Sequence, residues 1–344
     1  MKKFTRIIIW AMLSIMLQAA GLVYLDKVYF IDSSNFEVVK TEPVEENRNV
    51  DYSISSTATD INVSDDARYI SYFENEKLMV LDTKTLELKE VLADRDILYC
   101  DWVSDANMLM IAEKVNVNNW NQKVEILTIN VRNDFEGESV ELCTYDEGIK
   151  IDDIVSSIGT NTRYVGVSRT GFNSKIYRID VNRSVKNIGS TLPSLGGLKA
   201  VQRNDIIVYE DSLNKIFYSY TNEQNKKLNI KNAANLTLIG VDDDDNVYMG
   251  ELSNEKVTNI IYGPYNSASS TWKTINLEKP KDIKDIYLNS ENQILINDNL
   301  TGKVTNLTTN KSVQYEGKIL QLTDQLICSL NNNKIIITSL TDTE

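Results

Sequence analysis

The stretch Ile61–Leu88, INVSDDARYISYFENEKLMVLDTKTLEL, decides how this chain folds. Apolar and polar residues roughly alternate in Arg68–Phe73, and charged residues bound the apolar run in Lys77–Asp82. Both patterns are typical of β-strands, and short segments rich in Asp, Asn and Glu mark turns beside them. With Leu86–Val91 as a further strand, the stretch predicts an antiparallel sheet of four short strands.

Weaker copies of this pattern recur to the C-terminus, starting near residues 60, 97, 150, 197, 235, 281 and 317. Four antiparallel strands repeated about every 43 residues are typical of the blades of a β-propeller. The last copy is too short for four strands, so we expect Asn49–Ile54 to supply the missing one and close the ring. The chain therefore predicts an all-β fold, a propeller of about seven four-stranded blades over residues 49–344, with six or eight blades as alternatives.

Two segments carry a resemblance to a known family. Ile61–Tyr72 and Leu78–Thr85 resemble the repeat of TolB-like, WD-type and prolyl-oligopeptidase-type bacterial propellers, with Asp65 and Ala67 where that family has Pro and Gly. The resemblance implies a propeller fold. It does not extend to peptidase activity, because the sequence has no Gly-x-Ser-x-Gly motif and no histidine.

The N-terminus has the pattern of a membrane anchor. Lys2, Lys3 and Arg6 precede Ile7–Leu25, which contains no charged residue and has about the length that spans a bilayer as a helix. Basic residues on the N-terminal side predict a cytoplasmic tail at residues 1–6, a transmembrane signal-anchor at 7–25, a stalk at 26–48 and an extracytoplasmic domain at 49–344. The residues expected in the bilayer include Ile7, Trp10, Leu17 and Tyr24, with the aromatics near its two surfaces.

A cleaved signal peptide is the alternative for this segment, since Ala19–Gly21 offers small residues to a peptidase. However, the apolar run continues beyond that point, which favours an uncleaved anchor. In the stalk that follows, acidic residues surround Pro43, which predicts an extended rather than helical segment.

Composition excludes several classes of function. The formal net charge is −13, and no basic cluster lies outside the N-terminus, so we expect no binding to nucleic acid. The chain has no histidine, which excludes Ser-His-Asp and Cys-His catalysis and His-ligated metals. Cys100, Cys143 and Cys328 are isolated in the sequence, which indicates three core thiols or one disulfide and one thiol. We expect neither a metal nor a cofactor.

Acidic pairs are the remaining candidates for chemistry. The run Asp242–Asp245 lacks the Gly and the distal Glu of a calcium loop and falls where a blade turn is expected, so we interpret it as a turn. Asp152 with Asp153, and Asp101 with Asp105, have the composition of a glycosidase pair. Such pairs arise by chance in an Asp-rich chain, and a carboxylate-based glycoside hydrolase or lyase is a remote alternative.

Aromatic residues in long polar loops are the candidates for binding. Trp120 lies in a polar hairpin. Tyr262, Tyr265 and Trp272 lie in a separate long polar stretch, residues 262–272. Exposed Trp and Tyr can stack on sugars or anchor a protein interface. They can also pack on the edge of a blade, which is the simpler interpretation.

These features predict a non-enzymatic, membrane-anchored propeller outside the cell, acting as an interaction scaffold for an envelope protein or a cell-wall glycan. The alternative is a sensor or accessory subunit of a membrane complex, with the helix packed on partner helices through its polar residues Ser14 and Gln18.

Overall fold

The computed structural model describes residues 2–24 and 47–340, apart from 104–106, 119–120, 158, 189–191, 202, 243 and 290–291. It divides into two compact units, residues 1–45 and 46–344. The first unit contains the helix α1 (Lys2–Tyr24), in which Trp10, Leu17 and Tyr24 are exposed. In the described residues, the helix does not reach the combination of length and apolarity that a bilayer span needs, so the predicted anchor at 7–25 is not confirmed.

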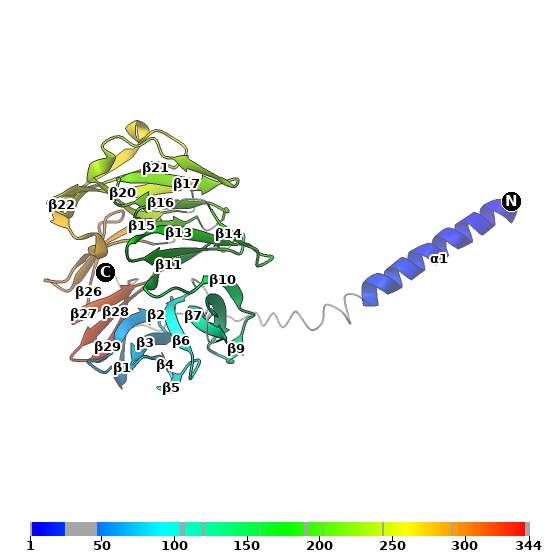
Figure 1. The fold of residues 1–344 in the computed structure, drawn as a ribbon, viewed down its shortest axis with the longest axis horizontal. Coiled ribbons are helices and arrows are strands. Elements are labelled where there is room, and N and C mark those ends of the chain that lie inside the picture. Colours follow the sequence, from blue (N-terminus) through cyan, green and yellow to red (C-terminus); the bar gives the residue numbers. More distant parts are fainter. Residues whose placement is uncertain are drawn as a thin grey trace. The chain divides into compact units, whose positions relative to one another are not determined.

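The second unit is a seven-bladed β-propeller, as the sequence predicts (Figure 1). Blade 1 consists of β2 (Thr59–Val63), β3 (Tyr69–Glu74), β4 (Lys77–Asp82) and β5 (Leu88–Glu90). Blade 2 consists of β6 (Asp96–Trp102), β7 (Met108–Asn118), β8 (Asn121–Asn130) and β10 (Val140–Thr144), with the short β9 (Phe135–Glu136) also paired to β8. Blade 3 consists of β11 (Ile149–Ser157), β12 (Thr162–Arg169), β13 (Phe172–Ile179) and β14 (Val185–Asn187).

The remaining blades follow the same order. Blade 4 consists of β15 (Leu195–Ala200), β16 (Ile207–Asp211), β17 (Ile216–Thr221) and β18 (Gln224–Lys227), and η3 (Ala233–Asn235) follows it. Blade 5 consists of β19 (Leu236–Val241), β20 (Asn246–Ser253), β21 (Lys256–Pro264) and β22 (Lys273–Lys281), with η4 (Ser269–Thr271) between the last two. After η5 (Ile283–Asp285), blade 6 consists of β23 (Ile286–Leu288), β24 (Ile294–Asp298), β25 (Lys303–Asn306) and β26 (Ser312–Gln314).

Blade 7 closes the ring with strands from both ends of the domain. It consists of β27 (Lys318–Leu322), β28 (Leu326–Asn331), β29 (Lys334–Ser339) and the N-terminal β1 (Arg48–Ser53). β1 pairs antiparallel with β29, with Val50 opposite Ile335, and the two lie side by side although they are far apart in the sequence (Figure 1). The predicted strand exchange is therefore confirmed, and it leaves no unpaired edge between the first and last blades.

Turn residues explain why the chain forms these short strands. In blade 1, Ser64 Oγ donates to Asp66 Oδ1 at 2.7 Å and accepts from the backbone N–H of Tyr69 at 3.0 Å, which fixes the β2–β3 turn. Ala67 in that turn has φ 51°, the left-handed conformation that favours Gly. Asp242 fixes the corresponding β19–β20 turn, since its Oδ1 accepts from the backbone N–H of Asn246 at 2.8 Å. This bond gives the acidic run a structural role.

The core consists of clusters between adjacent blades. One such cluster packs Met110 and Val124 of blade 2 against Ile154 and Val165 of blade 3. Because every strand pairing is antiparallel, the turns fall on two opposite faces of the propeller. We call face A the one that carries the turns between first and second strands and between third and fourth strands. Face B carries the turns between second and third strands and the connections between blades.

Candidate functional site in the central channel

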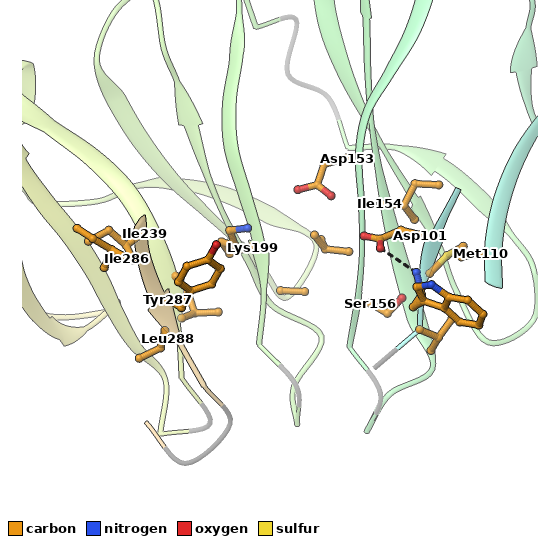
Figure 2. Close-up of a pocket in the computed structure, with 16 residues that line it drawn as sticks. Asp101, Met110, Asp153, Ile154, Ser156, Lys199, Ile239, Ile286, Tyr287 and Leu288 are labelled. Carbon is orange, nitrogen blue, oxygen red and sulfur yellow. Dashed lines mark hydrogen bonds between the residues drawn. The ribbon is translucent and has the colours of Figure 1, made fainter. Parts of the chain in front are cut away.

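A cavity of about 400 Å³ lies in the central channel, between the innermost strands of five consecutive blades. Its walls come from β6, β11, β15, β19 and β23, mostly from the ends of these strands that point to face A. Cavities of this size at the centre of a fold are typical of ligand sites. The polar side chains that line it are Asp101, Asp153, Ser156, Lys199 and Tyr287 (Figure 2).

A tyrosine connects two carboxylates from neighbouring blades. The Tyr99 hydroxyl lies 3.4 Å from Asp101 Oδ2 on the same strand and 3.4 Å from Asp153 Oδ1 on β11. Side chains two positions apart point to the same side of a strand, which places Tyr99 and Asp101 together. The other carboxylate oxygen of Asp101 accepts the backbone N–H of Trp102 at 2.8 Å, drawn as the dashed line in Figure 2.

Burial shifts the protonation of both carboxylates. It raises the pKa of Asp101 to about 6, and the negative charge of Asp153 contributes in the same direction. Burial also raises the pKa of Asp153, while the positive charge of Lys199 opposes this shift. Lys199 comes from β15, between the buried Leu198 and Ala200. The cavity therefore combines an acid that changes charge near pH 6, a second carboxylate and an ammonium group.

The structure rearranges the acidic pairs expected from the sequence. Asp101 and Asp153 share the cavity, although the sequence suggested Asp101 with Asp105 and Asp152 with Asp153. Asp105 lies outside the described residues. Asp152 does not line the cavity and accepts from Ser168 Oγ at 2.8 Å.

The aromatic loop residues lie elsewhere. Tyr262 stacks on Tyr248 with ring centroids 4.8 Å apart. Trp272 is half-buried, and its Nε1 donates to Ser267 Oγ at 2.9 Å. Tyr265 is half-buried against the core of blade 5. None of these three predicted binding residues lines the cavity, and Trp120 lies outside the described residues.

The three cysteines take no part in this site. All are free thiols, with Cys100 and Cys328 buried and Cys143 half-buried. Burial raises the pKa of the Cys100 thiol to about 12, so it is protonated and unreactive at neutral pH. In the described part of the chain, no group of three or more acidic or Cys side chains is arranged to hold a metal ion.

Sequence reasoning did not select Tyr99, Lys199 or Tyr287. Each lies on the first strand of its blade, where side chains face either a neighbouring blade or the channel. A usable signal was a polar residue inside an apolar first strand, such as Lys199 in LGGLKA. That signal depends on knowing which strand of each repeat is innermost.

Comparison with known proteins gives a fold and no family. No family model matches the sequence, and no curated protein matches it. Among solved structures, Hsv2 from Kluyvelomyces marxianus superposes with TM-score 0.51 at 10% identity, over 81% of this chain and 90% of that chain. A prolyl endopeptidase superposes with TM-score 0.51 at 10% identity, over 75% of this chain and 42% of that longer chain.

Acylaminoacyl peptidase from Pyrococcus horikoshii also matches, with TM-score 0.44 at 12% identity, over 83% of this chain and 45% of that chain. This chain thus spans less than half the length of either peptidase. At such identities the likeness shows the propeller fold alone.

Proposed function

We propose that this protein is a non-enzymatic binding module, in which the propeller holds a group of an envelope protein or a cell-wall glycan in its central channel. The observation that carries the proposal is the cavity of about 400 Å³ lined by five blades. Its mixture of carboxylate, ammonium and hydroxyl groups suits a polar ligand, since well-placed polar groups give a binding site its orientation and specificity. Among the described residues, all of these polar side chains lie on strands of the propeller.

The sequence supports a location at the membrane. Ile7–Leu25 carries no charge and follows a basic tail, and this amino-acid pattern supports a propeller that is held outside the cell. Resistance of the full chain to carbonate extraction, with the propeller accessible to protease added outside, is the expected result. Release of the chain by carbonate contradicts this location.

The TolB-like resemblance of blade 1 belongs to the same proposal. It adds the expectation of a scaffold that docks on other envelope components, or of an accessory subunit of a membrane complex. Loss of complex assembly when the N-terminal helix is replaced by poly-Leu favours the accessory subunit. Assembly that depends on the channel residues instead favours the scaffold.

The binding test compares channel variants with a matched control. Asp153→Asn and Lys199→Glu alter the cavity, whereas Asp152→Asn makes the same chemical change one residue away from Asp153 and outside the cavity. After cross-linking in intact membranes, the full chain and the Asp152→Asn variant are expected to retain the same partner, and the two channel variants to lose it. Equal retention by all four proteins contradicts the proposal.

A second candidate function is hydrolysis by the carboxylates. The convergence of Asp101 and Asp153 on one cavity favours it, because glycosidases use one protonated and one ionised carboxyl group. Turnover of a cell-wall glycan by the full chain, abolished by Asp101→Asn, establishes this activity. Such a result replaces the non-enzymatic proposal.

A further inference from the structure

The charged side chains of the central cavity fall into two groups on different sides of it. Asp101 and Asp153 come from blades 2 and 3, and the Tyr99 hydroxyl connects their carboxylates. Lys199 comes from blade 4 and Tyr287 from blade 6. Figure 2 shows the two carboxylates on one side of the cavity and Lys199 with Tyr287 on the other. We call Asp101 with Asp153 the acidic pole, and Lys199 with Tyr287 the donor pole.

The two poles do not bond to each other. The positive charge of Lys199 opposes the rise in the pKa of Asp153, so the field of the ammonium group reaches this carboxylate. However, the hydrogen bonds of the two carboxylates go to Tyr99 and to the backbone N–H of Trp102. No ion pair joins either carboxylate to Lys199, and the structure describes all three residues. Space that a ligand can fill therefore lies between unlike charges.

All four side chains of the poles can contact a molecule in this space. Each of them is half-buried and forms part of the cavity wall. An ammonium group only donates hydrogen bonds, whereas an ionised carboxylate only accepts them. Burial raises the pKa of Tyr287, so its hydroxyl stays protonated at neutral pH and can donate as well. The cavity therefore offers donors on one side and acceptors on the other.

We propose that the cavity binds an amino-acid group, whose ammonium contacts Asp101 and Asp153 and whose carboxylate contacts Lys199 and Tyr287. This ligand class rests on the proposed binding function and deepens it. A free amino acid carries both charged groups on one carbon atom, so one small molecule supplies a partner to each pole. Hydrogen bonds between ionised groups are about twice as strong as those between neutral groups, and charges partly withdrawn from water need such partners.

The size of the cavity agrees with such a ligand. A water molecule occupies about 30 Å³ in the liquid, so about 400 Å³ holds an organic molecule rather than a single small ion. Ile286 and Leu288 of β23 line the same space and can pack against the carbon atoms of the ligand. The amino-acid group can be a free amino acid or the end of a cell-wall peptide, since both present the same charges.

The test is calorimetric titration of the full chain, purified in detergent, near neutral pH. Three probes have related carbon skeletons: alanine carries both charged groups, ethylamine only the ammonium, and propionate only the carboxylate. Both enantiomers of alanine are titrated. We expect one of them to bind at least about tenfold more tightly than ethylamine or propionate, because each of these lacks the hydrogen bonds of one pole.

Two variants assign the poles to the two ends of the ligand. Asp153→Asn should reduce the affinity for alanine to that for propionate, and should bind propionate at least as tightly as the wild type does. Lys199→Met should reduce the affinity for alanine to that for ethylamine, and should bind ethylamine at least as tightly as the wild type does. The matched controls are Asp152→Asn, outside the cavity, and Lys226→Met, at an exposed residue of β18 in blade 4. Both should bind alanine as the wild type does.

A retention experiment distinguishes the two sources of the group. Retention of the full chain on purified cell wall, reversed by free alanine, assigns the group to the wall. Binding of alanine without retention on cell wall assigns a free amino acid.

Two results overturn the inference. One is the absence of any preference for alanine over ethylamine and propionate in the wild-type chain, which needs no variant. The other is an undiminished affinity for alanine in Lys199→Met or Asp153→Asn. If cross-linking still shows a partner that depends on Asp153 and Lys199, while alanine has no preference, the ligand class is wrong and the binding function stands.

Discussion

Replacing Asp101 by Asn should stabilise the protein at neutral pH and leave it unchanged in acid. Burial raises the pKa of Asp101 from its ordinary value of 3.8 to about 6. The folded protein therefore binds this proton more tightly than the unfolded chain does, and stability falls as the pH rises from about 4 through 6. One pKa unit corresponds to about 1.4 kcal/mol, so ionised Asp101 destabilises the fold by about 3 kcal/mol above pH 7.

Asn has the shape of Asp and keeps the acceptor for the backbone N–H of Trp102, so little else should change. The measurement is urea unfolding of the full chain in detergent at pH 4 and pH 8, followed by tryptophan fluorescence. We expect the variant to exceed the wild type by about 2–3 kcal/mol at pH 8 and to equal it at pH 4. Asp51→Asn, at a side chain 88% exposed, is the control and should have no such effect. A variant less stable than wild type at pH 8 refutes the reasoning.

Three further predictions concern the fold and are checked by thermal or urea denaturation. Val50→Ala in the closing strand, at a side chain 3% exposed, should cost about 2 kcal/mol, and an unchanged stability contradicts closure through β1. Ala67→Gly should stabilise by about 0.5–1 kcal/mol, since φ 51° favours Gly, so a loss of stability contradicts the strain. Gly263→Ala places a Cβ 2.4 Å from Trp272 Cδ1 and should cost about 1–3 kcal/mol; no cost means that Trp272 moves freely.

Most of the fold was predictable because it repeats. The expected repeat starts near residues 60, 97, 150, 197, 235, 281 and 317 fall close to the first strands β2, β6, β11, β15, β19, β23 and β27. Even the closing strand was predictable, because the last repeat lacks a strand and Asn49–Ile54 has strand character. Each of these inferences uses local periodicity, which the sequence contains directly.

The site was not predictable to the same degree. Asp101 and Asp153 are in the sequence as acidic residues, but their meeting through Tyr99 depends on how two blades pack. Loop aromatics such as Trp272 were binding candidates because polar residues surround them in the sequence. In the structure, packing on Gly263 accounts for the position of Trp272. Side-chain contacts between neighbouring blades carry no local signal.

The central claim, that the channel holds a bound group, is tested most directly by site-specific photo-cross-linking in intact membranes. A benzophenone amino acid replaces Tyr287, which lines the cavity, or Phe172 on face B, which is 61% exposed. The account predicts an adduct with an envelope protein or glycan at Tyr287 that is lost on adding Lys199→Glu. Adducts from the Phe172 position alone, or from Tyr287 irrespective of Lys199, contradict it.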